Sequence, residues 1–360
     1  MKGYLVLENG DVYEGELFGK CKESYGELIF NTSMTGYQEI IYDPSYKGQI
    51  VVMTYPLIGN YGINEEDTES YKVHLEGFVV KERSKLYSNW RATKDLNGFF
   101  KENGIVGIEG VDTRRITLTL REEGALKGGI FYGKFSREEM IEKVRKSPGL
   151  IGRDLVKEVV KKQPYWWKKE GKYKVVVIDC GVKYNILRIL SSLNVKVMVM
   201  PAFTPWEEIM KEKPDGILIS NGPGDPAPLH YLIKNVSNLV EKIPIFGICL
   251  GHQILGQVFG GKTYKLKFGH HGANHPVKDI KTGKIYITVQ NHGFCIASET
   301  LKEKNIEITH INLNDNTLEG IQHKKFPVFS VQFHPEASPG PRESRYLFQK
   351  FYNLINGKKN

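Results

Sequence analysis

Hydrophobic and polar positions follow two different patterns along the chain, and the change occurs near residue 173. Beyond it, short apolar runs alternate with stretches of helical periodicity. The predicted elements are strands at 175–178, 195–200, 216–219 and 243–248, and helices at 185–193 and 229–242. This spacing indicates a parallel sheet with helices on both faces. Residues 173–360 are therefore predicted to form a doubly wound, mostly parallel α/β domain.

The first 150 residues show a mixed α and β pattern without regular alternation. Gly3–Leu7 and Gln49–Met53 have β-type composition, and the Asn9-Gly10 pair is typical of a hairpin turn. Asp112 precedes a helical stretch and is a candidate helix N-cap. Residues 1–150 are predicted to form a separate mixed α/β domain.

A polar, Lys-rich stretch, 151–172, separates the two patterns. Pro164 and the high density of charge are typical of a linker. Trp166 and Trp167 have two interpretations, a docking point for the two domains or local anchors of the linker.

Composition indicates a globular protein, since 40% of residues are hydrophobic and 25% are charged. No apolar run approaches membrane-spanning length, and Glu8 and Asp11 interrupt any signal-peptide core. The four cysteines are scattered without a CxxC pair, which argues against a zinc site or a disulfide framework. We expect a cytoplasmic enzyme without membrane contact.

The net charge is +9, from 50 basic and 41 acidic residues. The lysines are spread along the chain, and no nucleic-acid motif accompanies them. We therefore expect no nucleic-acid binding, and interpret the charge as a solvated surface or a surface for an acidic partner protein.

The most informative stretch is Gly247-Ile248-Cys249-Leu250-Gly251, between an apolar run and a predicted helix. A Gly-x-nucleophile-x-Gly turn between strand and helix exposes a reactive side chain at the end of a parallel sheet. The helix N-terminus favours a thiolate at Cys249. Cys249 is predicted to be a covalent nucleophile; a buried structural cysteine is the alternative.

A cysteine nucleophile needs a base, and the base needs an orienting group. His334 follows the apolar stretch Val328–Phe333, and Glu336 lies two residues further on. Residues two apart share a face of an extended chain, so Glu336 can orient His334. His334 is predicted to act as general base and then as general acid.

Acyl chemistry also needs donors for an oxyanion. The backbone N–H of Leu250 is one candidate, and Gly222 in the glycine loop Ser220–Pro226 is another. A plain Pro-Gly turn is the alternative for that loop.

Metal and nucleotide sites are not predicted in this chain. Adjacent histidines such as His270 and His271 point poorly at one ion, and no carboxylate or cysteine accompanies them. Walker and GxGxxG loops are absent, so neither ATP nor NAD is expected on this chain.

Together these motifs resemble the triad-type (class I) glutamine amidotransferases, and most closely the family of carbamoyl phosphate synthase small chains. The amidotransferase resemblance rests on Gly247–Gln253, Ser220–Pro226 and His334-Pro335-Glu336. The small-chain resemblance rests on Asn31–Glu39, Asp43–Tyr46, Gly110–Arg114 and Phe268–Gly272. It covers essentially the whole chain.

The resemblance implies that the substrate is L-glutamine, hydrolysed through a thioester at Cys249. It implies a heterodimer with a large synthetase chain, which receives the ammonia and carries ATP and Mg itself. The carbamoyl phosphate made there would serve arginine synthesis, pyrimidine synthesis or both. The implied glutamine-binding residues are Ser45, Gly222, Gly224, Leu250, Gln253, Asn291, Gly293 and Phe294. Ser45 would place the site near the domain interface.

Two positions depart from the family pattern. Cys180 stands where an aromatic residue is usual, and Ala273 replaces a common glycine. Two other functions remain open: a stand-alone cysteine hydrolase, such as a peptidase or γ-glutamyl hydrolase, and a scaffold subunit with an inert triad.

Overall fold

The computed structural model describes residues 1–301 and 304–357, which separate into two compact units. The first unit contains Met1–Ile151 together with Lys267–Gly272. The second contains Gly152–Leu266 and the residues from Ala273 onward. In the described ranges, none of the helices has the length and apolar character needed to cross a membrane.

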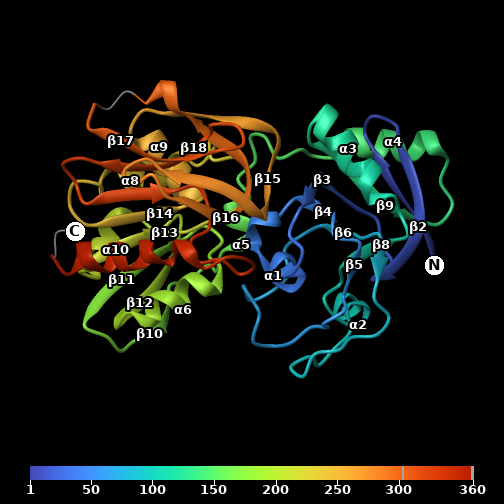
Figure 1. Cartoon of the computed structure of the whole chain (residues 1–360), viewed down its shortest axis with the longest axis horizontal. Helices are drawn as coiled ribbons and strands as arrows, with labels where there is room; N and C mark the ends of the chain where they lie inside the picture. Colours follow the sequence, from blue (N-terminus) through green and yellow to red (C-terminus); the bar gives the residue numbers. More distant parts are fainter. Residues whose placement is uncertain (302–303, 358–360) are drawn as a thin grey trace. The chain divides into compact units, whose positions relative to one another are not determined.

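A closed β-barrel forms the centre of the first unit (Figure 1). Its strands, in order around the barrel, are β1 (Lys2–Leu7), β2 (Val12–Gly19), β8 (Val106–Glu109), β6 (Gly77–Val79), β4 (Gln49–Met53), β3 (Ser24–Asn31) and β9 (Leu126–Tyr132). Fully buried side chains such as Leu5, Ile50 and Ile108 belong to its core. The sequence predicted the mixed α and β content but not the barrel, because closure depends on pairs between strands far apart in the chain.

Local features of the first unit agree with the sequence pattern. β1 and β2 pair antiparallel across the predicted hairpin turn, where Gly10 has a φ of 104°. The side chain of Asp112 accepts a hydrogen bond from Arg115 N and caps α3 (Thr113–Glu123). The other elements are α1 (Tyr37–Tyr42), the 3-10 helix Pro44–Tyr46, β5 (Leu57–Ile58), β7 (Glu82–Arg83), α2 (Leu96–Glu102) and α4 (Arg137–Lys146).

Residues 267–272 are far away in sequence but hydrogen-bond within the first unit. Ala125 N donates to Lys267 O at 2.7 Å, and Thr32 N donates to His271 O at 3.1 Å. The ring of Phe268 lies 5.7 Å from that of Phe30. The sequence pattern gave no indication of this return of the chain.

The second unit is built on a ten-stranded sheet. Its strands, in spatial order, are β10 (Tyr165–Lys168), β12 (Val195–Pro201), β11 (Tyr173–Asp179), β13 (Gly216–Ile219), β14 (Ile245–Ile248), β19 (Val328–Val331), β18 (Leu318–His323), β17 (Ile306–Asn312), β15 (Lys262–Asp279) and β16 (Ile285–Ala297). The strands from β12 to β19 pair in parallel, which confirms the predicted strands and their direction. β15 and β16 were not predicted, because polar residues interrupt their alternation.

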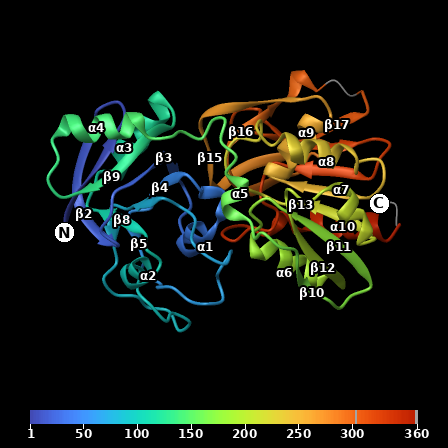
Figure 2. The same ribbon diagram turned by 180° about the vertical axis from the view of Figure 1, so that it is seen from behind.

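Helices pack on both faces of the parallel strands (Figures 1 and 2). Alternate strand residues enter two cores: Ile217 and Ile245 in one, Leu218 and Phe246 in the other. The first core includes residues of α7 (Trp206–Lys211), α8 (His230–Ser237) and α9 (Leu250–Val258). The second includes residues of α6 (Tyr184–Ser192) and α10 (Tyr346–Ile355). This is the two-sided burial expected of parallel strands.

The stretch expected to be a linker has ordered structure. It contains α5 (Val156–Val159) and β10, which pairs antiparallel with β12. The ring of Trp167 lies 5.0 Å from that of Tyr184, and Lys174 Nζ lies 5.5 Å from the ring centre of Trp166. Both tryptophans therefore have partners within the second unit.

We predict that Phe246→Ala lowers the free energy of unfolding of the second unit by about 3–5 kcal/mol. Phe246 is fully buried on the central strand β14, and its ring stacks on Phe329 with centroids 4.5 Å apart. Urea denaturation followed by circular dichroism measures the loss. Ile285→Ala, at a side chain that is 58% exposed, is the control and should change stability little. Equal losses in the two variants would contradict this account.

Candidate active site

Cys249 occupies a strained turn between β14 and α9. It has a φ of 53°, which a residue with a side chain rarely adopts, and it is the N-cap of α9. The N–H of Cys249 donates to Val331 O at 2.9 Å, and the N–H of Gly251 donates to Ser220 O at 3.1 Å. These bonds tie the turn to the ends of two neighbouring strands.

The two glycines of the turn are required by packing. A Cβ at Gly251 would lie 2.3 Å from Ile219 O, and one at Gly247 would lie 2.7 Å from Leu255 Cδ1. Helix α9 therefore lies so close to the sheet that neither position accepts a side chain. This is the elbow that the sequence pattern indicates.

A buried cluster of three ionisable side chains contains His334, Glu336 and Lys183. His334 Nδ1 lies 2.7 Å from Glu336 Oε1, and Lys183 Nζ lies 3.0 Å from the same oxygen. Lys183 Nζ also donates to Ala337 O at 2.6 Å. The side chains of Lys183 and Glu336 are 1% and 0% exposed. Three ionisable groups thus share one buried site.

The charges of this site set its protonation. Burial would raise the pKa of Glu336, but the charges of Lys183 and His334 hold it well below its usual range. Burial would lower the pKa of His334, but the Glu336 carboxylate and the Cys249 sulfur raise it well above its usual range. The site thus favours an imidazolium at His334.

The Cys249 sulfur has amide neighbours as well. Gln332 Nε2 lies 3.6 Å from Cys249 Sγ, which in turn lies 3.7 Å from Asn291 O. Gln253 Nε2 donates to Phe294 O at 2.7 Å and to Gln332 Oε1 at 3.1 Å. Of the predicted residues, Asn291 therefore lies next to the sulfur, whereas Gln253 and Phe294 are connected to it through Gln332.

The predicted glycines differ in their packing. A Cβ at Gly222 would lie 2.2 Å from Cys180 O and 2.7 Å from Leu250 Cδ2, so the loop after β13 presses against the start of α9. Gly224 has a φ of 82°. A Cβ at Gly293 would meet no atom of the described residues within 4 Å, so space is open above β16.

Ser45 is the one predicted site residue in the first unit. It lies in the 3-10 helix Pro44–Tyr46, where its N–H donates to Asp43 Oδ1 at 2.9 Å. The residue is buried, with 7% of its surface exposed.

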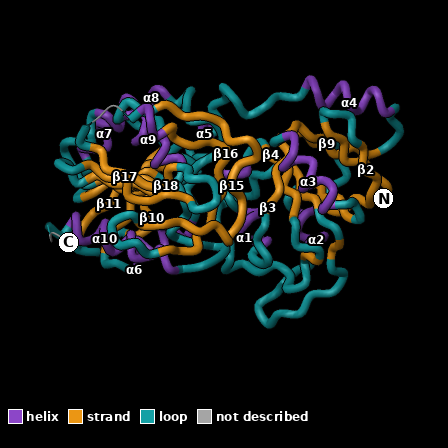
Figure 3. The backbone as a smooth tube through the Cα atoms, turned by 45° about the horizontal axis from the view of Figure 1, so that its top comes forward, coloured by secondary structure: helices purple, strands orange, loops and turns teal. Residues whose placement is uncertain are grey.

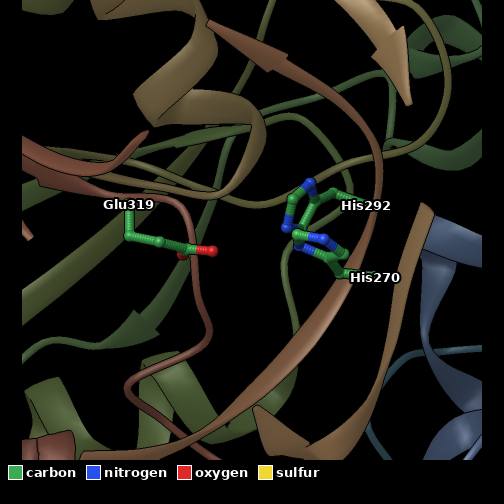
Figure 4. A group of neighbouring side chains, drawn as sticks. All are labelled: His270, His292 and Glu319. Atoms are coloured by element: carbon green, nitrogen blue, oxygen red, sulfur yellow. The ribbon is translucent and has the colours of Figure 1, made fainter. Parts of the chain in front are cut away.

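Glu319 on β18 and His292 on β16, which the sequence analysis did not select, are buried near the site residues of β16 (Figure 4). Asn312 Nδ2 donates to Glu319 Oε1 at 3.0 Å. The ring nitrogens of His292 lie 2.9 Å from Phe294 O and 2.8 Å from Gln290 Oε1. Since both ring nitrogens face protein oxygens, His292 orients the β16 segment, and we assign it no metal. His270, also drawn in Figure 4, belongs to the first unit.

Two family models match the chain, one for each unit. Residues 176–354 match "Glutamine amidotransferase class-I", and residues 5–130 match "Carbamoyl-phosphate synthase small chain, CPSase domain". The carbamoyl phosphate synthase small chain of Syntrophotalea carbinolica is 52% identical over 99% of this chain and 98% of its own length. That of Aquifex aeolicus is 53% identical over 98% of each. The chain belongs to the carbamoyl phosphate synthase small-chain family.

In this member of the small-chain family, sequence reasoning gave no role to Lys183, although it placed the segment 179–183 at the carboxyl end of a strand, and it did not select Gln332. Gln332, His334 and Glu336 are spaced two apart, so the alternation that related His334 to Glu336 also indicates Gln332. Lys183 has a weaker signal, a lone cation just after the apolar strand β11. Cys180, one of the departures, is fully buried, and burial raises the pKa of its thiol. The backbone of Cys180 packs against Gly222, and we interpret Cys180 as a structural residue.

We predict that Lys183→Met destabilises the second unit by about 3–5 kcal/mol, because it leaves the Glu336 carboxylate buried without its cation. It should also lower the rate of ammonia release from glutamine. Urea denaturation and an ammonia assay measure the two effects. The double variant Lys183→Met, Glu336→Gln should recover most of the stability but not the activity. Unchanged stability in the single variant would show that the ion pair is unimportant.

A second prediction concerns stability against pH. The pKa of His334 is raised from 6.5 to about 10. The stabilisation that its protonated ring adds to the free energy of unfolding is therefore complete below pH 6.5 and is lost as pH rises through 10. Between these values the wild-type free energy of unfolding should fall more steeply than that of His334→Gln. His230→Gln, at an exposed histidine, should keep the wild-type slope. Parallel curves for wild type and His334→Gln would refute the assignment.

Proposed function

We propose that this chain is the glutaminase subunit of carbamoyl phosphate synthase. It hydrolyses L-glutamine through a thioester at Cys249 and passes ammonia to a large synthetase chain. That chain makes carbamoyl phosphate from bicarbonate and ATP, for arginine synthesis, pyrimidine synthesis or both. The observation that carries the proposal is the buried set of Cys249, His334 and Glu336 in a chain whose two parts match the two models of this family.

Each residue has a definite role in the proposed reaction. The Cys249 thiolate attacks the side-chain amide carbon of glutamine, and the carbonyl oxygen becomes an oxyanion at the N–H groups of Leu250 and Gly222. His334, held by Glu336, gives its proton to the leaving nitrogen and then deprotonates the water that cleaves the thioester. Lys183 keeps Glu336 ionised.

The glutamine-binding residues in this proposal are Ser45, Gly222, Gly224, Leu250, Gln253, Asn291, Gly293 and Phe294. In this proposal, backbone groups of β16 bind the charged ends of the amino acid, and the open space beside Gly293 supports that role. Ser45 is the one residue of this set that belongs to the first unit.

The proposal also assigns the parts of the chain. Residues 173–360 are the doubly wound amidotransferase domain, residues 151–172 lead into it and add α5 and β10 to the second unit, and residues 1–150 dock the large chain in a heterodimer. No cofactor is needed here, since ATP and Mg belong to the large chain. The four free cysteines support a reducing, cytoplasmic location.

We predict that Cys249→Ser lowers glutamine-dependent carbamoyl phosphate synthesis by the complex at least about a thousandfold. Ammonia-dependent synthesis should stay within about twofold, because the thiolate serves only to release nitrogen. Both rates are measured on complexes of equal stoichiometry, with Cys21→Ser as the control. Loss of both activities would make Cys249 structural.

Ammonia release by the purified wild-type chain, with and without the large chain, separates the alternatives. A stand-alone hydrolase should be fully active alone, and an inert scaffold should release no ammonia in either state. The proposed subunit should be stimulated when the large chain binds ATP and bicarbonate.

A further inference from the structure

Gln332 is a fully buried glutamine whose amide faces the Cys249 sulfur. It follows β19, is 0% exposed, and places its Nε2 3.6 Å from Cys249 Sγ. The N–H of Gln332 donates to Glu319 O at 2.9 Å. One residue earlier, Val331 O accepts from Cys249 N at 2.9 Å. The amide and the sulfur therefore belong to backbone segments that are hydrogen-bonded to each other.

A series of hydrogen bonds fixes which end of this amide faces the sulfur. Phe294 O is a carbonyl oxygen and can only accept, so the group of Gln253 that lies 2.7 Å from it is the NH₂. The same NH₂ also donates to Gln332 Oε1 at 3.1 Å. Gln332 then presents its own NH₂ to the sulfur. Gln253 lies on α9, which packs against the sheet (Figure 3), so the series is anchored on a rigid element.

The two hydrogen-bond partners of the sulfur favour opposite protonation states. Asn291 O, 3.7 Å from Cys249 Sγ, accepts from a thiol and repels a thiolate. The Gln332 N–H donates to the sulfur, and a hydrogen bond to an ionised acceptor is roughly twice as strong as one to a neutral acceptor. Gln332 therefore opposes the effect of Asn291 O and favours the ionised nucleophile.

Gln332 differs from His334 as a partner of the sulfur because an amide does not titrate. In the proposed reaction His334 gives its proton to the leaving nitrogen, whereas the Gln332 N–H remains a donor at every step. When the C–S bond of the thioester breaks, its electron pair returns to the sulfur. The Gln332 donor is then already in place for the anion.

We propose that Gln332 is a further catalytic residue, which donates to the Cys249 sulfur, and that Gln253 is the positioning residue that orients the Gln332 amide. The inference rests on the proposed function and adds these two roles to it. Because Gln253 also belongs to the proposed glutamine-binding set, one series of hydrogen bonds connects the substrate site with the nucleophile.

The first test measures alkylation of Cys249 by iodoacetamide across pH in the full-length chain, with the modified peptide identified by mass spectrometry. Gln332→Met removes the donor at similar side-chain length. The rate near pH 7 should fall about tenfold, and the pH of half-maximal rate should rise by about one unit. The rate at the high-pH plateau should stay within about twofold, because the sulfur itself is unchanged.

Gln322→Met is the matched control, on the neighbouring strand β18. It removes an amide that donates to Glu307 Oε2 at 3.0 Å, and it should keep the wild-type profile. An unchanged profile in Gln332→Met would overturn the proposal. A lowered plateau in that variant would overturn it as well, since it would indicate a displaced sulfur and a purely structural role.

Two more variants keep the test decisive if Gln332→Met does not fold. Gln332→Asn keeps the amide but withdraws it by one methylene, and should show the same rise in the pH of half-maximal rate. Gln253→Met leaves the Gln332 amide in place without its orienting partner, and should cause a smaller rise. The double variant Gln253→Met, Gln332→Met should match Gln332→Met alone. Additive shifts would show that the two amides act independently, against the proposal.

Ammonia release separates this inference from the proposed function. In the complex with the large chain, Gln332→Met should lower kcat about tenfold to a hundredfold and change KM for glutamine less than about threefold. A wild-type kcat in this variant would overturn the inference and leave the proposed function standing. If the wild-type complex released no ammonia from glutamine, the proposed function would fail and the inference with it.

Discussion

The second unit depends on the close approach of α9 to the parallel sheet at Cys249. A Cβ at Gly247, Gly251 or Gly222 would fall within 2.7 Å of another atom, and all three glycines lie at or beside this turn. The strain at Cys249, with its positive φ, is stored there because strands, loop and helix together fix the backbone. The reactive sulfur is thus placed by packing against rigid elements rather than by a flexible loop.

The second constraint is electrostatic. An isolated carboxylate as buried as Glu336 would be expected to take up a proton. Lys183 and His334 prevent this by supplying charge from two sides. The three groups therefore keep one another charged. Lys183 follows β11, and His334 and Glu336 follow β19. Burial strengthens the electrostatic interactions among these groups.

Local and short-range features were predictable from the sequence. The elbow, the four parallel strands, the Asp112 cap and the Asn9-Gly10 hairpin each arise from neighbouring residues with a strong physical preference. The barrel, the long strands β15 and β16, and the ordering of residues 151–172 depend on partners distant in sequence. Lys183 was missed for the same reason, since only the folded chain brings it to Glu336 across 153 positions.

The return of residues 267–272 to the first unit has a consequence for synthesis. The backbone N–H groups of Ala125 and Thr32 donate to Lys267 O and His271 O. A nascent chain leaving the ribosome therefore cannot complete its first unit after residue 151. It must wait until more than half of the second unit has been made. Folding of the two units is linked in time by the order of translation, although each has its own core.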